Sequence, residues 1–235
     1  MIIKKGKIDS TLPRDYIARI GLFSDVHVGY TSWGDYSKLT NVINGMNAKK
    51  PDFCVILGDC IDSGYERTPE LMAEQKEILN THLTRLKSPC FKMRGNHDSD
   101  VSSFTDFGVI TFNGLRFVCI FPKYVQMEDT STFDSRGRLT EDDIEWISEK
   151  LKEGDGYTNV ILSHYCIVED DPTNFKWPIC DTVTNYNGVV IDGHRDELME
   201  LLSRYGVDLF INGHEHKDGL INKKVDDTDM TDVQI

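Results

Sequence analysis

Residues 53–59 read FCVILGD, an apolar run of five side chains followed by a glycine and an aspartate. A short, continuous apolar run is typical of a strand that is buried on both faces. In open α/β sheets, ligands bind just beyond the carboxyl ends of the strands. We therefore expect Gly58 and Asp59 to stand at a functional edge of a sheet.

Four further signatures follow short apolar runs in the same way: DVH at 25–27, GNHD at 95–98, SH at 163–164 and GHEH at 213–216. Carboxylates, amides and imidazoles are common ligands of divalent cations. Two adjacent cations need one anionic bridge and several further ligands. One such signature alone carries little weight, but five in this order predict a two-metal site.

Apolar periodicity between these signatures predicts alternating strands and helices. Asn113-Gly114 is a strong hairpin signal, and Thr140 with Asp143 forms a helix-capping pattern. We expect strands at 17–23, 53–57, 91–93, 109–112, 115–121, 160–162 and 208–211, and helices at 35–49, 71–86, from 140 onward and 194–205.

Two segments lack this periodicity, and neither divides the chain, so residues 1–235 are interpreted as one domain. The irregular insert 165–193 is either a lid or specificity loop, or a surface hairpin without substrate contact. The acidic tail 225–235 carries Asp226, Asp227, Asp229 and Asp232, and we expect a solvated or frayed end.

Composition narrows the classes of partner. The formal net charge of −13 disfavours a nucleic-acid backbone as the main partner, because such binding needs clustered Lys and Arg. No stretch approaches the roughly 20 apolar residues of a membrane span, so no membrane association is expected. Six cysteines without a CxxC pair favour free thiols in a reducing compartment, which predicts a cytoplasmic protein.

In their order, spacing and flanking residues, these signatures resemble the calcineurin-like metallophosphoesterase superfamily, from about residue 17 to about residue 220. The resemblance implies an α/β fold, a four-layer α/β/β/α sandwich of two mixed sheets with the metals at one edge. It also implies two divalent ions, with Mn²⁺ first and Fe, Zn, Ni, Co or Mg as alternatives.

The resemblance further implies a ligand set and a proton donor. Asp59 would bridge the ions, His97 would protonate the leaving oxygen, and Asp98 would orient the His97 ring. No covalent phosphoenzyme is then needed, because a hydroxide between the ions would attack directly. The ligands of the first ion would be Asp25, His27, Asp59 and His216, and those of the second Asp59, Asn96, His164 and His214.

This sequence differs from two branches of the superfamily at residues that define them, which limits the branches that it can resemble. Ser63 replaces the phosphate-gripping arginine of protein serine/threonine phosphatases, and Asp62 replaces the tyrosine ligand of purple acid phosphatases. What remains resembles class III cyclic-nucleotide phosphodiesterases and manganese-dependent ADP-ribose pyrophosphatases.

This remaining branch implies a small phosphorylated substrate, with a nucleotide as one candidate. Tyr30, Trp33 and Trp177 are aromatic residues that could stack a base. The bond could be a phosphodiester, a phosphomonoester or a pyrophosphate. The alternative is a catalytically weak, metal-bearing protein-interaction module. The sequence does not indicate an oligomeric state.

Overall fold

A computed structural model describes residues 18–29, 36–62, 68–98, 104–126, 135–167, 191–192, 194–207, 209–214, 216, 219–225 and 228–234. Three sheets are formed by this part of the chain. The first sheet contains β1 (Ile20–Phe23), β2 (Phe53–Ile56) and β3 (Cys90–Lys92). The second sheet has six strands, which lie side by side in the order β11 (Gly219–Val225), β12 (Thr228–Gln234), β10 (Leu209–Asn212), β8 (Thr158–Ser163), β5 (Leu115–Ile120) and β4 (Gly108–Phe112). The third sheet is small and contains β6 (Lys123–Gln126), β7 (Ser135–Arg138) and β9 (Ile191–Asp192).

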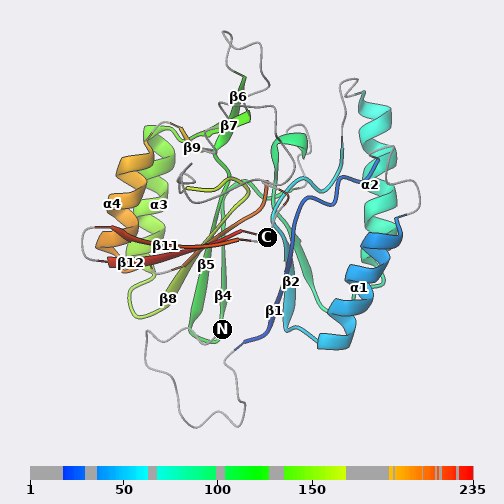
Figure 1. The fold of residues 1–235 in the computed structure, drawn as a ribbon, viewed down its shortest axis with the longest axis horizontal. Helices are drawn as coiled ribbons and strands as arrows, with labels where there is room; N and C mark the ends of the chain where they lie inside the picture. Colours follow the sequence, from blue (N-terminus) through cyan, green and yellow to red (C-terminus); the bar gives the residue numbers. More distant parts are fainter. Residues whose placement is uncertain are drawn as a thin grey trace.

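Helices cover the outer faces of the two large sheets (Figure 1). On one side lie α1 (Ser37–Lys49) and α2 (Pro69–Leu83), and on the other α3 (Glu141–Glu153) and α4 (Arg195–Arg204). This confirms the expected sandwich of two sheets between helices. The six-stranded sheet contains both parallel and antiparallel strand pairs, whereas the described strands of the first sheet are all parallel.

The apolar run at 53–57 shows why the sheets are stacked in this way. Phe53, Val55 and Leu57 belong to the core between the two large sheets. Cys54 and Ile56 point to the opposite face and pack with residues of α1 and α2. Since successive strand side chains alternate between faces, a strand in the middle of four layers must be apolar at every position.

The two turn and cap signals are confirmed. β4 and β5 pair antiparallel, and Asn113 (φ 48°) and Gly114 (φ 81°) both have the positive φ that a tight two-residue hairpin requires. Helix α3 begins with a capping box: Thr140 Oγ1 accepts from the Asp143 amide at 3.3 Å, and the Asp143 carboxylate accepts from the Thr140 amide at 2.8 Å.

This cap allows a stability prediction. We expect Thr140→Ala to lower the free energy of unfolding by about 1 kcal/mol, because it leaves an amide of the first helical turn without an acceptor. Urea denaturation measures the change. Thr140→Ser is the matched control, since it keeps the hydroxyl, and a loss equal to that of the alanine variant would contradict the role of the cap.

The expectation for the tail was wrong. Residues 228–234 are not frayed but form β12, which lies between β10 and β11 in the six-stranded sheet. It pairs parallel to β10 and antiparallel to β11. The insert 165–193 is described only at its ends: Tyr165, Cys166 and Ile167 are buried, β9 pairs with β7, and residues 168–190 and 193 lie outside the described residues.

In the described part of the chain, no helix combines the length and the apolar character needed to cross a membrane.

Candidate metal centre

The five signatures meet at one edge of the sandwich, where β1, β2, β3, β8 and β10 end. The strand pairing of β1 and β2 continues into the first two signatures. The Asp25 amide donates to the Gly58 carbonyl at 3.1 Å, and the His27 amide donates to the Asp59 carbonyl at 2.9 Å. These bonds fix the DVH and GD segments against each other before any side chain is considered.

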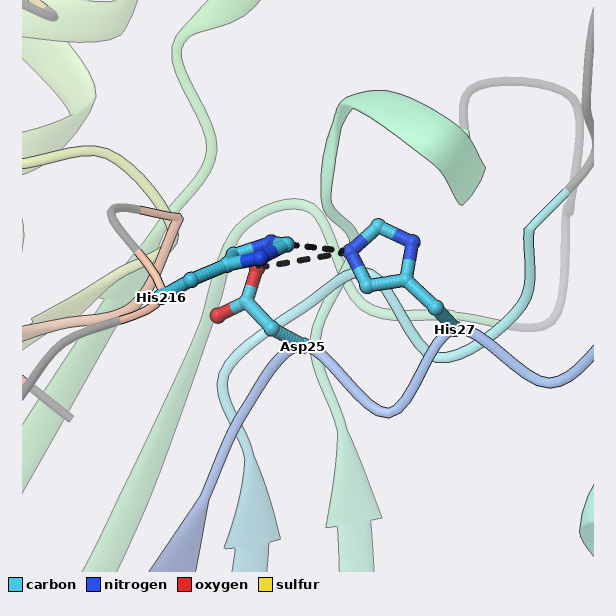
Figure 2. Close-up of side chains that lie close together, drawn as sticks. All are labelled: Asp25, His27 and His216. Carbon is cyan, nitrogen blue, oxygen red and sulfur yellow. Dashed lines mark hydrogen bonds and ion pairs between the residues drawn. The ribbon is translucent and has the colours of Figure 1, made fainter. Parts of the chain in front are cut away.

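The first cluster contains Asp25, His27 and His216, which come from the two ends of the motif series and point toward one another (Figure 2). The Nε2 atoms of His27 and His216 are 3.0 Å apart. Asp25 Oδ1 lies 3.2 Å from His216 Nε2 and 3.8 Å from His27 Nε2. A single ion can contact all three atoms, because metal–nitrogen and metal–oxygen bonds are about 2.0–2.2 Å long.

The second cluster contains Asp59, His164 and His214, with Asn96 beside them. Asn96 Oδ1 lies 2.9 Å from His164 Nε2 and 3.0 Å from His214 Nδ1, and these two nitrogens are 3.2 Å apart. His164 Nδ1 lies 2.8 Å from the Leu57 carbonyl, which can only accept, so Nδ1 carries the hydrogen. In the neutral ring, the lone pair of Nε2 therefore faces the cluster, as in metal-ligating histidines.

Asp59 lies between the two clusters. Its Oδ2 is 3.5 Å from His27 Nε2 and 3.4 Å from His164 Nε2, and its Oδ1 accepts from the His97 amide at 2.8 Å. Burial alone would raise the pKa of Asp59, but the nearby His164 outweighs it and lowers this pKa to about 2. The carboxylate is thus ionised and lies within 3.5 Å of a histidine from each cluster, which the bridging role expected from the sequence requires.

The donor set fits divalent cations. Burial lowers the pKa of His214 to about 3, and a positive charge on His164 acts in the same direction. Burial also disfavours a charged His164, but Asp59 outweighs this effect and raises the pKa of His164 to about 9. A proton on His164 thus disfavours a proton on His214, whereas a bound metal ion would accept both nitrogens as ligands and would offset the negative charge of the buried carboxylates.

Several candidate ligands also have an unusual backbone conformation. A positive φ is uncommon outside glycine, and such residues concentrate at functional sites, where the surrounding structure holds them. Five of the seven candidate ligands have one: Asp25 (53°), His27 (44°), Asp59 (47°), His214 (74°) and His216 (53°). The loops after the strands are therefore bent to aim these side chains inward.

Glycines next to the ligands make this close packing possible, and a matched pair of substitutions tests it. A Cβ at Gly95 would collide with the Asp59 amide and carboxylate, whereas a Cβ at Gly45, in the middle of α1, meets nothing within 4 Å. We expect Gly95→Ala to weaken metal binding roughly 10- to 100-fold. Gly45→Ala should leave it unchanged and raise stability by about 0.5–1 kcal/mol. Equal metal affinity in both variants would contradict this interpretation.

His97 lies beside the bridge without being one of the seven candidate ligands. Its side chain is 34% exposed, and its Nε2 is 4.0 Å from Asp59 Oδ2. Its Nδ1 is 2.8 Å from Asp62 Oδ1, so Asp62 is the carboxylate that orients the ring. Sequence reasoning missed Asp62 in this role, although its place three residues after Asp59 is visible in the chain.

Asp98 does not hydrogen-bond to the His97 ring that it was expected to orient. Its carboxylate accepts hydrogen bonds from the backbone N–H groups of Gly95, Cys60 and Ile61 at 3.0–3.1 Å. Asp98 therefore connects the GNHD segment to the residues that follow the GD segment. The ring-orienting role expected for Asp98 is thus reassigned to Asp62. Burial, and then the negative charge of Asp59, raises the pKa of Asp98 to about 7.

Comparisons with known proteins agree with this geometry. The UDP-2,3-diacylglucosamine hydrolase of Vibrio cholerae is 23% identical over 191 residues, which cover 77% of this chain and 74% of that protein. A dimetal phosphatase from Danio rerio has a TM-score of 0.65 at 15% identity, covering 93% of this chain and 87% of that one. A purple acid phosphatase from yellow lupin seeds has a TM-score of 0.60 at 12% identity, covering 93% and 43%.

The family model for calcineurin-like phosphoesterases matches residues 18–218, a range that includes all five signatures. The similar structures share the fold, and the relative in Vibrio cholerae is a hydrolase by name. The chain therefore belongs to the calcineurin-like phosphoesterase family and is a metal-dependent phosphoester hydrolase.

Proposed function

We propose that this protein hydrolyses a small phosphorylated substrate by direct attack of water, without a covalent phosphoenzyme. The observation that supports this most strongly is the pair of ligand clusters joined by Asp59. Two divalent ions, when bound there, would lower the pKa of water toward neutrality and stabilise negative charge on the phosphate.

The two clusters suggest how the ligands divide. Asp25, His27 and His216 would hold one ion and Asn96, His164 and His214 the other, with Asp59 contributing to both. The amide of Asn96 is neutral, which limits the negative charge that an approaching phosphate meets. Mixed oxygen and imidazole ligands suit Mn²⁺, which is our first choice, and Fe, Zn, Ni, Co and Mg remain alternatives.

Within the same proposal, His97 donates the proton that the leaving oxygen needs. Its backbone amide is held by Asp59 and its Nδ1 by Asp62, so both the position and the rotation of the ring are fixed. Nε2 lies 4.0 Å from Asp59 Oδ2, and the partial exposure of the side chain leaves room for substrate. A positioned imidazole of this kind is the commonest general acid in enzymes.

The substrate class is tested with a panel of phosphomonoesters, phosphodiesters and pyrophosphates, each assayed with Mn²⁺, Ni²⁺, Co²⁺, Zn²⁺ and Mg²⁺. The name of the Vibrio cholerae relative contains a UDP-linked sugar, so UDP-sugars belong in the pyrophosphate group, and nucleotides belong in all three. We expect turnover in at least one group, reversible loss on chelation, and no turnover by Asp59→Asn. Bound metal without any turnover would instead support an interaction module.

Two further expectations join this proposal. The five cysteines in the described residues are free thiols, which supports a cytoplasmic location, and Cys180 lies outside the described residues. We also propose that residues 1–235 form one domain, because the candidate ligands come from signatures spread between residues 25 and 216.

A further inference from the structure

A cavity lies at the end of the sandwich opposite to the metal ligands. It is formed where α3 ends, β8 begins and α4 ends, and its volume is about 350 Å³. Cavities of roughly 300–1,000 Å³ are typical of small-molecule sites. Asn159 in this cavity and His164 in the metal centre are separated along β8 by roughly 16 Å, so the two places are distinct. The residues on which the inference depends are Lys152, Gly154, Tyr157, Asn159, Arg204 and Tyr205.

Asn159 supplies a buried polar group at this cavity. Only 8% of the residue is exposed, and its Nδ2 donates to the Gly154 carbonyl at 3.2 Å. Its Oδ1 is buried and accepts no hydrogen bond from any described residue. An unsatisfied buried acceptor is unfavourable, so a bound molecule that carries a donor would stabilise this position.

The charged side chains at the cavity favour an anion. Lys150 and Arg116, which lie nearby, are both paired with Glu153. Lys152 and Arg204 also line the cavity, and neither forms an ion pair with any described residue. They outnumber the one acidic residue of the lining, Asp155. In a protein of net charge −13, two such cations at one cavity form a local site for negative charge.

Two tyrosines supply flat apolar surface at the same place. Tyr157 is 43% exposed, and Tyr205 is half-buried at the end of α4. Neither ring contacts another aromatic ring or a cation in the described part of the chain. Tyr205 also packs in part against the neighbouring core, so the exposed Tyr157 ring and the outer part of the Tyr205 ring are the surfaces on which a base could stack.

From these three observations we infer that this cavity is an accessory site for a compound of the nucleoside monophosphate class. The base lies against Tyr157 and Tyr205, one of its N–H groups donates to Asn159 Oδ1, and the phosphate lies at Lys152 and Arg204. The inference uses no residue of the metal centre and stands or falls separately from the proposed function.

The test is a nuclear magnetic resonance titration of the isotope-labelled full chain, in Mg²⁺ buffer, with adenosine 5′-monophosphate. We expect saturable shifts of the backbone resonances at 151–159 and 204–205, which are followed separately from those of the metal ligands. Lys152→Gln combined with Arg204→Gln should weaken binding at this set roughly tenfold or more. Both residues are exposed, so the fold should be retained. Lys87→Gln is the matched control, an exposed lysine in the loop between α2 and β3.

Two further titrations separate the parts of the ligand. Inorganic phosphate should shift mainly Lys152 and Arg204, and adenosine mainly the tyrosines and the Asn159 side-chain amide, each more weakly than the monophosphate. Asn159→Ala should weaken adenosine but not inorganic phosphate. The inference is overturned if the shifts occur only at the metal ligands, if the double variant binds like Lys87→Gln, or if inorganic phosphate binds as tightly as the nucleotide.

Discussion

Replacing Asp59 with Asn is expected to weaken the binding of both metal ions at once and to lower activity at least ~100-fold. Substitutions of residues that only support metal ligands cost up to about this much. The reason is geometric. Asp59 Oδ2 lies 3.5 Å from His27 in the first cluster and 3.4 Å from His164 in the second. The variant keeps the size of the side chain and removes the only charge that both clusters share.

The control is His27→Ala, because the His27 ring belongs to the first cluster and has no contact with Asn96 or His214 in the described residues. It should loosen mainly one ion. Equilibrium dialysis followed by elemental analysis gives the metal stoichiometry of each variant. If Asp59→Asn retained both ions with wild-type affinity, the carboxylate would not be the bridge, and the two clusters would have to be regarded as independent sites.

The meeting of the five signatures could be predicted from the sequence because each one stands at or just beyond the end of a strand. A strand's end is set by its own apolar run, and parallel strands end at a common edge. The DVH and GD segments illustrate this, since their backbones continue the pairing of β1 and β2 to His27 and Asp59. Local sequence and sheet topology therefore determine this part of the site together.

The roles of Asp62 and Asp98 could not be separated in the same way. Asp98 is the last residue of the GNHD signature, whereas Asp62 follows the GD signature by three residues, so sequence distance favours Asp98 as the partner of His97. The short 3-10 helix η2 (Asn96–Asp98) turns Asp98 back onto the amides of Gly95, Cys60 and Ile61. Asp62, 35 residues away in sequence, takes the contact with the ring. Proximity in sequence does not determine the direction of a side chain within a single tight turn.

The C-terminal strands were missed for a different reason. Residues 228–234 read TDMTDVQ, in which polar and acidic side chains interrupt the apolar pattern that identifies the central strands. Their place in the sheet is given by backbone pairing to β10 and β11, which places few demands on side-chain type. Composition alone therefore favoured a solvated end where pairing between distant segments makes a strand.

The second large effect is expected from His97→Ala, which should keep both metal ions and slow substrates with poor leaving groups roughly 10²- to 10⁴-fold, the range of general acid catalysis. The His97 ring lies next to the Asp59 carboxylate, with Nε2 4.0 Å from Asp59 Oδ2. Its nitrogen lies close enough to His27 and Asp59 to hold an ion with them, but the two clusters described above contain their histidines and carboxylates without it. A p-nitrophenolate group leaves almost without a proton. The variant should therefore lose much less activity toward p-nitrophenyl esters than toward alkyl or nucleoside phosphates.

Asp62→Asn provides the matched test of how the ring is held, because it keeps a hydrogen-bonding side chain at the same place. If the Asp62 carboxylate orients His97 for proton transfer, this variant should show the same dependence on leaving group as His97→Ala, with a smaller loss. Metal stoichiometry should stay at the wild-type value in both variants. An equal loss on both substrate types would refute the proton-donor role and leave His97 as a phosphate-binding residue, because phosphate binding is needed whatever group departs.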